Sequence, residues 1–170
     1  MKNKFIYIFL IFAFNLTTFF LVKAEEFNFN TTELQITENG NLIKGIDGGT
    51  VSTVNNQIII SADNFQYNKI TTLLEAQGNV RLIDKIADIV IESNKIFYLK
   101  NKEKIYTKGE SKAISGIDIQ IDADQYFKYN KLTSFLEAKG NVILNDKSKK
   151  IIIHTNEILY SMNEEKIFTL

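Results

Sequence analysis

The stretch YNKITTLLEAQGNVRLID at residues 67–84 returns as YNKLTSFLEAKGNVILND at residues 129–146, with 12 of 18 positions identical. Tyrosines recur at half of this interval, at Tyr67, Tyr98, Tyr129 and Tyr160. A fixed period of this length is the signature of a repeat architecture. The chain is therefore predicted to be an array of 31-residue units.

Apolar and polar residues alternate within both stretches, as expected for β-strands with one dry and one wet face. The apolar face carries Leu74, Ala76, Val80 and Leu82 in the first copy, and Leu136, Ala138, Val142 and Leu144 in the second. A further strand is predicted before each tyrosine of these copies, through Ile58, Ile60 and Ala62, and through Ile119, Ile121 and Ala123. Each unit is thus expected to contain two to three short strands, and the fold class is all-β.

Glycines and asparagines mark the breaks in this pattern. Gly78, Gly109 and Gly140 each follow a tyrosine of the series at the same offset. Because the apolar alternation continues through the glycine, we expect a β-bulge or a close backbone approach there. Tight turns are expected just after the tyrosines, where asparagine is suited to a left-handed backbone. These turns fall at Asn68-Lys69, Asn101-Lys102, Asn130-Lys131 and Asn163-Glu164.

The ends of the array are expected to be irregular. The glycine due after Tyr160 would fall at position 171, so the last repeat is expected to be unfinished and its edge extended by more protein. Toward the N-terminus only a degenerate copy is expected, with Ile36 in the tyrosine's place and Gly45 following it at a shorter offset. Units stacked in order leave edge strands with free backbone groups, to which another chain can pair.

Residues 1–24 have the layout of a secretory signal. Lys2 and Lys4 precede an apolar run, and Val22-Lys23-Ala24 places small residues where a signal peptidase cleaves. An uncleaved membrane anchor is the alternative, since the run is close to the roughly 20 residues that span a bilayer. We expect residues 25–53 to be a leader with the degenerate copy, and residues 54–170 to form the main β-domain.

Composition excludes several function classes. After removal of the signal, 17 basic side chains remain against 20 acidic ones, so nucleic acid is not an expected partner. The chain has no cysteine, which excludes disulfides and thiolate metal sites. We find no metal-ligand spacing, phosphate loop or catalytic triad, and no cofactor, metal or enzymatic activity is expected.

Individual polar residues are interpreted as structural. His154, the only histidine, is expected to be structural or on the surface. The pairs Asp63 with Asp124, and Glu75 with Glu137, recur at equivalent places, and recurring carboxylates more often bond turn amides than act as acid and base. The tyrosines are expected to be core or turn-flanking aromatics rather than ligand platforms.

The apolar inner face is the candidate binding site. A stack that does not close would leave a groove of aliphatic and aromatic side chains suited to an acyl chain, and each methylene buried there is worth about 0.8 kcal/mol. The alternative is that the two halves meet and form an ordinary core. Both interpretations remain open from the residues alone.

The units ADNFQYNKITTLLEAQGNVRLID and ADQYFKYNKLTSFLEAKGNVILND resemble the repeat of the OstA-like family, the periplasmic lipopolysaccharide-transport domains LptA, LptC and the N-terminal part of LptD. This resemblance covers about residues 54–170. It implies a twisted, half-open β-jellyroll that stacks edge to edge with other such domains and carries lipopolysaccharide by its acyl chains to the outer membrane. The family offers no catalytic residue, and its lipid-facing positions correspond here to Ile60, Phe65, Leu74, Val80, Ile91, Leu136 and Val142.

Several family members fit. The leader and the unfinished repeat favour the N-terminal domain of an LptD-like outer-membrane assembly protein, whose partners would be an outer-membrane barrel and its lipoprotein. An LptA-like free-standing bridge and an LptC-like anchored protein are the alternatives. Outside the family, we considered an adhesin-like β-solenoid with a closed core, and a solenoid carbohydrate enzyme, which would need clustered carboxylates that the sequence lacks.

Overall fold

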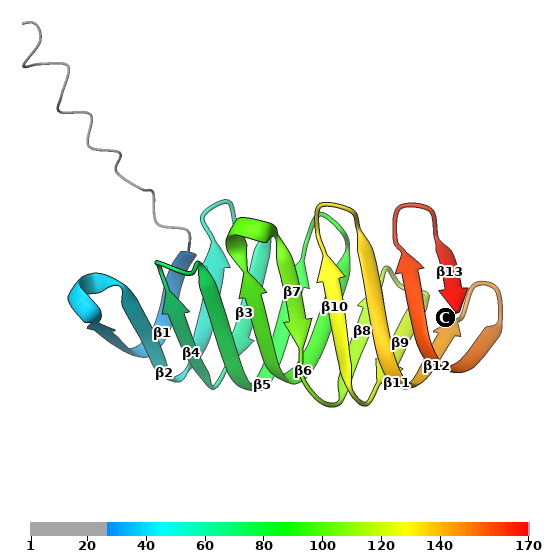
Figure 1. The fold of residues 1–170 in the computed structure, drawn as a ribbon, viewed down its shortest axis with the longest axis horizontal. Coiled ribbons are helices and arrows are strands. Elements are labelled where there is room, and N and C mark those ends of the chain that lie inside the picture. The colour runs from blue at the N-terminus through cyan, green and yellow to red at the C-terminus, as the bar shows by residue number, and fades with distance from the viewer. Residues whose placement is uncertain (1–26, 170) are drawn as a thin grey trace, which may run out of the picture.

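The computed structural model describes residues 27–169, which form thirteen strands of one antiparallel sheet and no α-helix. The elements in chain order are β1 (Phe27–Thr37), η1 (Glu38–Gly40), β2 (Leu42–Thr53), β3 (Ile58–Ala62), β4 (Asn64–Asn68), β5 (Leu73–Asp84), β6 (Ile89–Leu99), η2 (Lys100–Lys102), β7 (Lys104–Thr107), β8 (Ser111–Ser115), β9 (Ile119–Ala123), β10 (Tyr126–Asn130), β11 (Phe135–Asp146), β12 (Ile151–Ser161) and β13 (Lys166–Thr169). Figure 1 shows the strands side by side along the long axis, from blue at the N-terminus to red at the C-terminus. The all-β prediction is confirmed.

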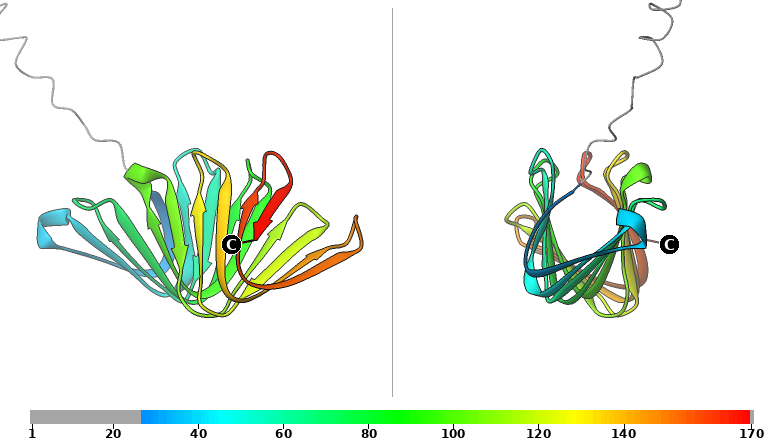
Figure 2. Two further views of the ribbon diagram at one scale, coloured as in Figure 1. Left: turned by 45° about the vertical axis from the view of Figure 1, so that its right-hand side comes forward. Right: turned by 90° about the vertical axis from the view of Figure 1, so that its left-hand side faces the viewer.

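The sheet is folded into two layers. Long strands run through both: the first half of β5 pairs with β4, and the second half pairs with β3. In the same way β6 pairs with β7 and β8, and β11 with β10 and β9. We call the layer with β3, β8 and β9 layer A, and the layer with β4, β7, β10 and β13 layer B. Seen along the row of strands, the layers meet at one edge and diverge at the other, as in a half-open β-jellyroll (Figure 2).

The bend between the layers coincides with two of the three predicted bulges, at Gly78 and Gly140, whereas at Gly109 the strand is interrupted between β7 and β8. In β5, Gly78 and Asn79 together oppose the single residue Asn94 of β6, and both have positive φ, 80° and 47°. Two residues facing one is the geometry of a β-bulge, which bends the strand that carries the extra residue. Gly140 and Asn141 form the same bulge in β11, with φ of 90° and 42°.

Asp63 and Asp124 hold these bulges. The Asp63 amide donates to the Gly78 carbonyl at 3.0 Å, and the Asn79 side-chain amide donates to Asp63 Oδ2 at 2.9 Å. Asp124 makes the equivalent bonds to Gly140 and Asn141, at 2.9 Å and 2.5 Å. These contacts confirm that the two aspartates have a structural role.

Replacing Gly140 by alanine is expected to destabilise the protein more than replacing Gly109. Both have a φ that L-residues rarely adopt, 90° and 84°, and that strain costs about 1–2 kcal/mol. A Cβ on Gly140 would in addition overlap Asp124 Oδ1, whereas at Gly109 it would meet nothing within 4 Å. The clash should add about 1–3 kcal/mol to the loss in free energy of unfolding, measured in urea. Equal losses would show that Asp124 does not require the glycine.

The N-terminal strands belong to the same sheet. β1 pairs with β2, and β2 pairs with both β3 and β4. Their bulge lies at Asp47 and Gly48, which oppose Thr32 and stand one repeat before Gly78 and Asn79. Gly45, the glycine of the expected degenerate copy, lies in regular register opposite Phe65. Asp47, with φ of 60°, occupies the place that glycine has in the two later bulges, because aspartate tolerates positive φ.

Turns follow the tyrosine strands where expected, although Asn68 and Asn130 act through their side chains. The Oδ1 atom of Asn68 accepts the amides of Ile70 and Thr71 at 2.9 and 3.0 Å, as in an Asx turn. The left-handed residue is Thr72, with φ of 56°, not the asparagine. These turns end the strands of layer B at the edge where the two layers diverge, and a second series of turns ends the strands of layer A at the same edge (Figure 2). We call the turns at residues 54–57, 85–88, 116–118 and 147–150 lip A, and those at residues 69–72, 100–103, 131–134 and 162–165 lip B.

The expected signal segment, residues 1–24, lies outside the described residues. Within residues 27–169, no helix has the length and apolar character needed to cross a membrane.

Candidate functional site

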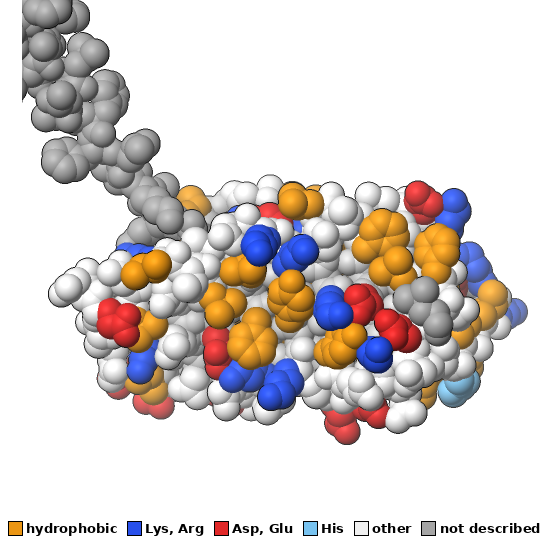
Figure 3. All heavy atoms as spheres, viewed as in Figure 1, with side chains coloured by type: hydrophobic (Ala, Val, Ile, Leu, Met, Phe, Trp, Pro, Cys, Tyr) orange, Lys and Arg blue, Asp and Glu red, His pale blue; other side chains and the backbone are white. Residues whose placement is uncertain are grey.

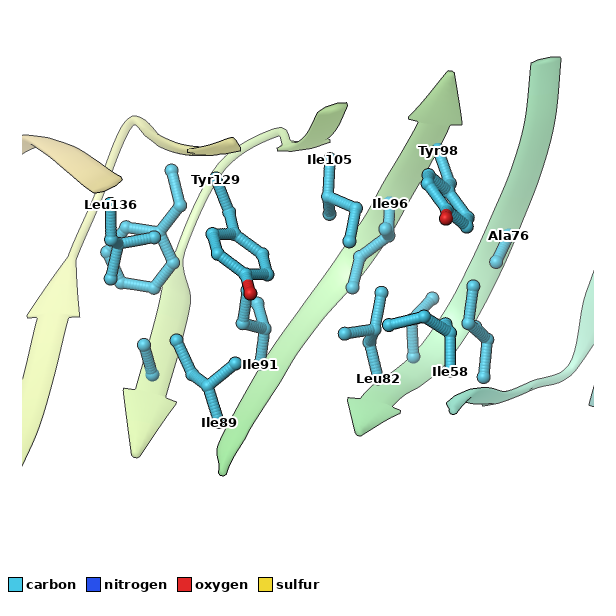
Figure 4. Close-up of a cluster of buried hydrophobic side chains, with 14 of the residues drawn as sticks. Ile58, Ala76, Leu82, Ile89, Ile91, Ile96, Tyr98, Ile105, Tyr129 and Leu136 are labelled. Carbon is cyan, nitrogen blue, oxygen red and sulfur yellow. The ribbon is translucent and has the colours of Figure 1, made fainter. Parts of the chain in front are cut away.

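The interior between the two layers contains all seven candidate groove residues. Ile60, Val80, Ile91 and Val142 project from layer A, and Phe65, Leu74 and Leu136 project from layer B. Each is at most 3% exposed, and all belong to one continuous core. The structure therefore brings the predicted residues together on the inner face, and neighbouring side chains fill the space around them (Figure 4).

The tyrosines form a row across layer B, beside the candidate residues. Tyr67 pairs with Leu74, which pairs with Tyr98, and the row continues through Ile105 to Tyr129. Leu136, Tyr160 and Ile167 complete it. All four tyrosines are at most 3% exposed, so the prediction of core aromatics is confirmed.

Two of the phenols bind carboxylates inside the molecule. The Tyr98 hydroxyl donates to Glu103 at 2.6 Å, and the Tyr129 hydroxyl donates to Asp84 at 3.0 Å. Burial raises the pKa of both tyrosines, and the carboxylate beside each one raises it further. Both phenols are therefore neutral hydrogen-bond donors at neutral pH.

Asp84 is the polar residue of this site that sequence reasoning missed. It is 1% exposed in layer A, yet it binds Tyr129 and Lys131 of layer B. Burial alone would raise the pKa of Asp84, but the hydrogen bond and charge of Lys131 together with the hydrogen bonds from the Ala87 amide and the Tyr129 hydroxyl lower it below its usual value. The sequence did carry a signal, because polar residues recur at this position of the 31-residue repeat. They are Thr53, Asp84, Ser115 and Asp146.

The other candidate polar residues lie on the outer surface. Glu75 forms an ion pair with Lys95 at 2.5 Å, and Glu137 with Lys128 at 2.7 Å, across neighbouring strands. His154 is exposed on β12, as expected. Within residues 27–169 no three histidine, cysteine or acidic side chains are placed to hold a metal ion.

The diverging edge carries exposed aliphatic side chains. Five of the large hydrophobic residues that face solvent lie on the two lips: Val54, Ile70, Ile86, Ile117 and Leu132, which are 58–87% exposed. Toward the C-terminal end, a cleft of about 390 Å³ opens between the lips, with Ser115 and Asp146 on one side and Tyr160 and Met162 on the other. The apolar interior thus meets solvent at the opening between lip A and lip B, which we call the mouth.

The remaining exposed hydrophobic residues concentrate at the two ends of the sheet. Leu34 and Ile36 lie on edge strand β1, and Ile152 and Phe168 on β12 and β13, at 45–62% exposure. In the space-filling view, hydrophobic side chains gather near the C-terminal strands and otherwise alternate with charged ones (Figure 3). Among the described strands, residues 151–155 of β12 pair with β11 only, so their other backbone edge is open.

These features define the class of protein by its fold, a two-layer, half-open β-jellyroll with an apolar interior. Neither the protein-family models nor the curated proteins compared with the sequence gave a match. Among solved structures, the chain is similar to LptH of Pseudomonas aeruginosa, described as the LptA-homologous periplasmic component of the conserved lipopolysaccharide transport device. The TM-score is 0.54 at 8% identity, over 85% of this chain and 93% of that one. At this identity the likeness shows a shared fold.

Proposed function

We propose that this protein is a periplasmic module that binds lipopolysaccharide by its acyl chains and conducts it toward the outer membrane. The observation that carries the proposal is the unbroken apolar inner face of both layers, from β2 to β12, beneath a mouth with aliphatic lips. The fold shared with LptH and the OstA-like sequence units point in the same direction.

An acyl chain suits this interior on physical grounds. It would pass along the row of strands between residues such as Leu74, Ile91 and Leu136, and each methylene transferred from water would contribute about 0.8 kcal/mol. The buried side chains would have to part to admit it, and the layers are joined at only one edge, so the mouth can widen without breaking strand pairing. The module acts by binding, with no catalytic step.

The edges would give this module its protein partners. Strand β1 and residues 151–155 of β12 offer unpaired backbone groups, which other jellyroll domains of the same kind could extend by strand pairing.

As the finer assignment we propose the N-terminal part of an LptD-like outer-membrane assembly protein, whose partners would be its barrel and a lipoprotein. A free-standing LptA-like bridge is the alternative, supported by the likeness to an LptA homologue. The gene sequence downstream of codon 170 distinguishes them, because a barrel would add alternating segments of roughly 10 residues.

Binding is expected to depend on the acyl chains. The purified protein should bind intact lipopolysaccharide, and fully deacylated lipopolysaccharide of the same strain should lose nearly all of that affinity, because only the chains can enter the apolar interior. Equilibrium binding of fluorophore-labelled lipopolysaccharide, competed by each unlabelled form, measures this difference. Equal competition by the two forms would mean that the sugars or phosphates are recognised, and no binding of either would favour a structural β-solenoid with a closed core.

A further inference from the structure

The two lips are joined at the middle of the mouth by a buried charged cluster. Asp84, at the end of β5, accepts hydrogen bonds from Lys131 Nζ at 2.6 Å and from the Tyr129 hydroxyl at 3.0 Å, both through Oδ2. Its other oxygen accepts the amides of Ile86 and Ala87 in its own lip, at 3.0 and 3.3 Å. One carboxylate therefore fastens lip A to lip B, although its partners are distant in the sequence.

Burial makes this cluster strong. Asp84 is 1% exposed, and the Lys131 side chain is 14% exposed. A paired charge shielded from water in this way is costly to separate, because each partner would be left without compensation. The cluster lies beside Ile89 and Ile91 of the interior, which are at most 1% exposed, so the mouth is shut there.

Asp146 stands two repeats after Asp84, at the equivalent position, and can be compared with it. Asp146 is equally buried, but its bonds come from Ser148 Oγ at 2.7 Å and from the Lys149 amide at 2.9 Å, both in its own lip. The cleft of about 390 Å³ lies beside Asp146, and the Tyr160 phenol on the opposite layer hydrogen-bonds to Ser115. Among residues 27–169, Asp84 thus has two partners across the mouth and Asp146 has none.

We propose that Asp84, Tyr129 and Lys131 form a clasp that holds the mouth shut and must be released before an acyl chain can enter the interior. The role of the clasp in admitting lipid rests on the proposed function; its role in holding the lips together does not. Lys131 is the element most readily released, since it lies on the turn at the solvent side, whereas Asp84 is also held by two amides.

The chain offers a matched control for Lys131. Lys100 stands one repeat earlier, at the same place in lip B, but it pairs with Glu103 of its own lip. Replacing either lysine by methionine removes one charge and preserves the length of the side chain. Only Lys131→Met removes a contact between the lips.

The first test needs no lipid. Because the protein lacks cysteine, I86C and L132C place one spin label on each lip, at positions that are 68% and 74% exposed. We expect Lys131→Met, and likewise Asp84→Asn, to shift the distance distribution between the labels to longer values, and Lys100→Met to leave it unchanged. Identical distributions in all of these variants would overturn the clasp.

The second test measures entry of fluorophore-labelled lipopolysaccharide by stopped flow. Loss of a hydrogen bond to a charged group should speed entry by about tenfold in Lys131→Met and leave Lys100→Met at the original rate. A short bis-maleimide bridge between I86C and L132C should block entry, while the same bridge between I86C and I117C, both on lip A, should not. Longer label distances with an unchanged entry rate would overturn the gating role. If labelled lipopolysaccharide fails to bind the unaltered protein, the proposed function fails, and the label distances still decide whether the clasp exists.

Discussion

Replacing Tyr98 by alanine is expected to lower the free energy of unfolding by about 3–5 kcal/mol, as for other buried aromatic residues. Tyr98 is fully buried, and it pairs with Leu74 on one side and with Ile105 on the other. The Phe27 ring meets it edge-on, with 5.7 Å between the ring centroids. Removal of the ring therefore opens a cavity in the middle of the row that joins the strands of layer B.

Tyr98→Phe is the matched control, because it keeps the ring and removes only the hydroxyl that donates to Glu103. Its expected cost is about 1–2 kcal/mol, since Glu103 remains paired with Lys100. Urea unfolding followed by circular dichroism measures both variants. Similar losses for Tyr98→Ala and Tyr98→Phe would mean that the ring contributes little, and that the tyrosines do not organise the core.

Much of the fold could be predicted from the sequence because it depends on local patterns. The alternation around Leu74 and Val80 places both on the inner face, and the Gly78-Asn79 pair marks the bulge that bends the strand. The recurrence of Asp63 at Asp124 identified both as structural, and the hydrogen bonds to the bulge asparagines confirm it. Each of these features is set by residues near one another in the chain.

Two features could not be predicted, for separate reasons. The first bulge has Asp47 where its counterparts have glycine, so the glycine pattern does not mark it. The cluster at Asp84 depends on how the two layers face each other, because the bend brings Lys131 and Tyr129 over a residue that reads locally as part of a turn. The 31-residue period could have drawn attention to Asp84, but it could not have identified the residues that bind Asp84.

Whether the inner face is an open groove or a filled core also depends on packing across the layers. The sequence predicts an apolar face on each strand and leaves both outcomes open. In the structure the candidate residues are covered, and the mouth opens at the cleft beside Asp146. Binding of an acyl chain therefore requires the buried side chains of the interior to move apart, at a cost in packing that the sequence pattern does not reveal.

Photo-crosslinking from the interior is expected to have an all-or-none result, because neighbouring residues of one strand point to opposite faces. Phe65 and Leu74 are buried, whereas their neighbours Gln66 and Glu75 point outward on β4 and β5. Each of the four is replaced in turn by benzoyl-phenylalanine, and circular dichroism verifies that each variant is folded. The two residues of each pair are neighbours in the chain but point to opposite faces of the sheet, so each outward site is the control for its inward neighbour.

Illumination of the four variants with bound lipopolysaccharide, followed by measurement of the adduct yield at each site, shows whether acyl chains lie between the two layers. We expect adducts from positions 65 and 74 and none above background from positions 66 and 75. Equal yields from the inward and outward sites, in folded protein, would contradict the claim that acyl chains are bound between the two layers.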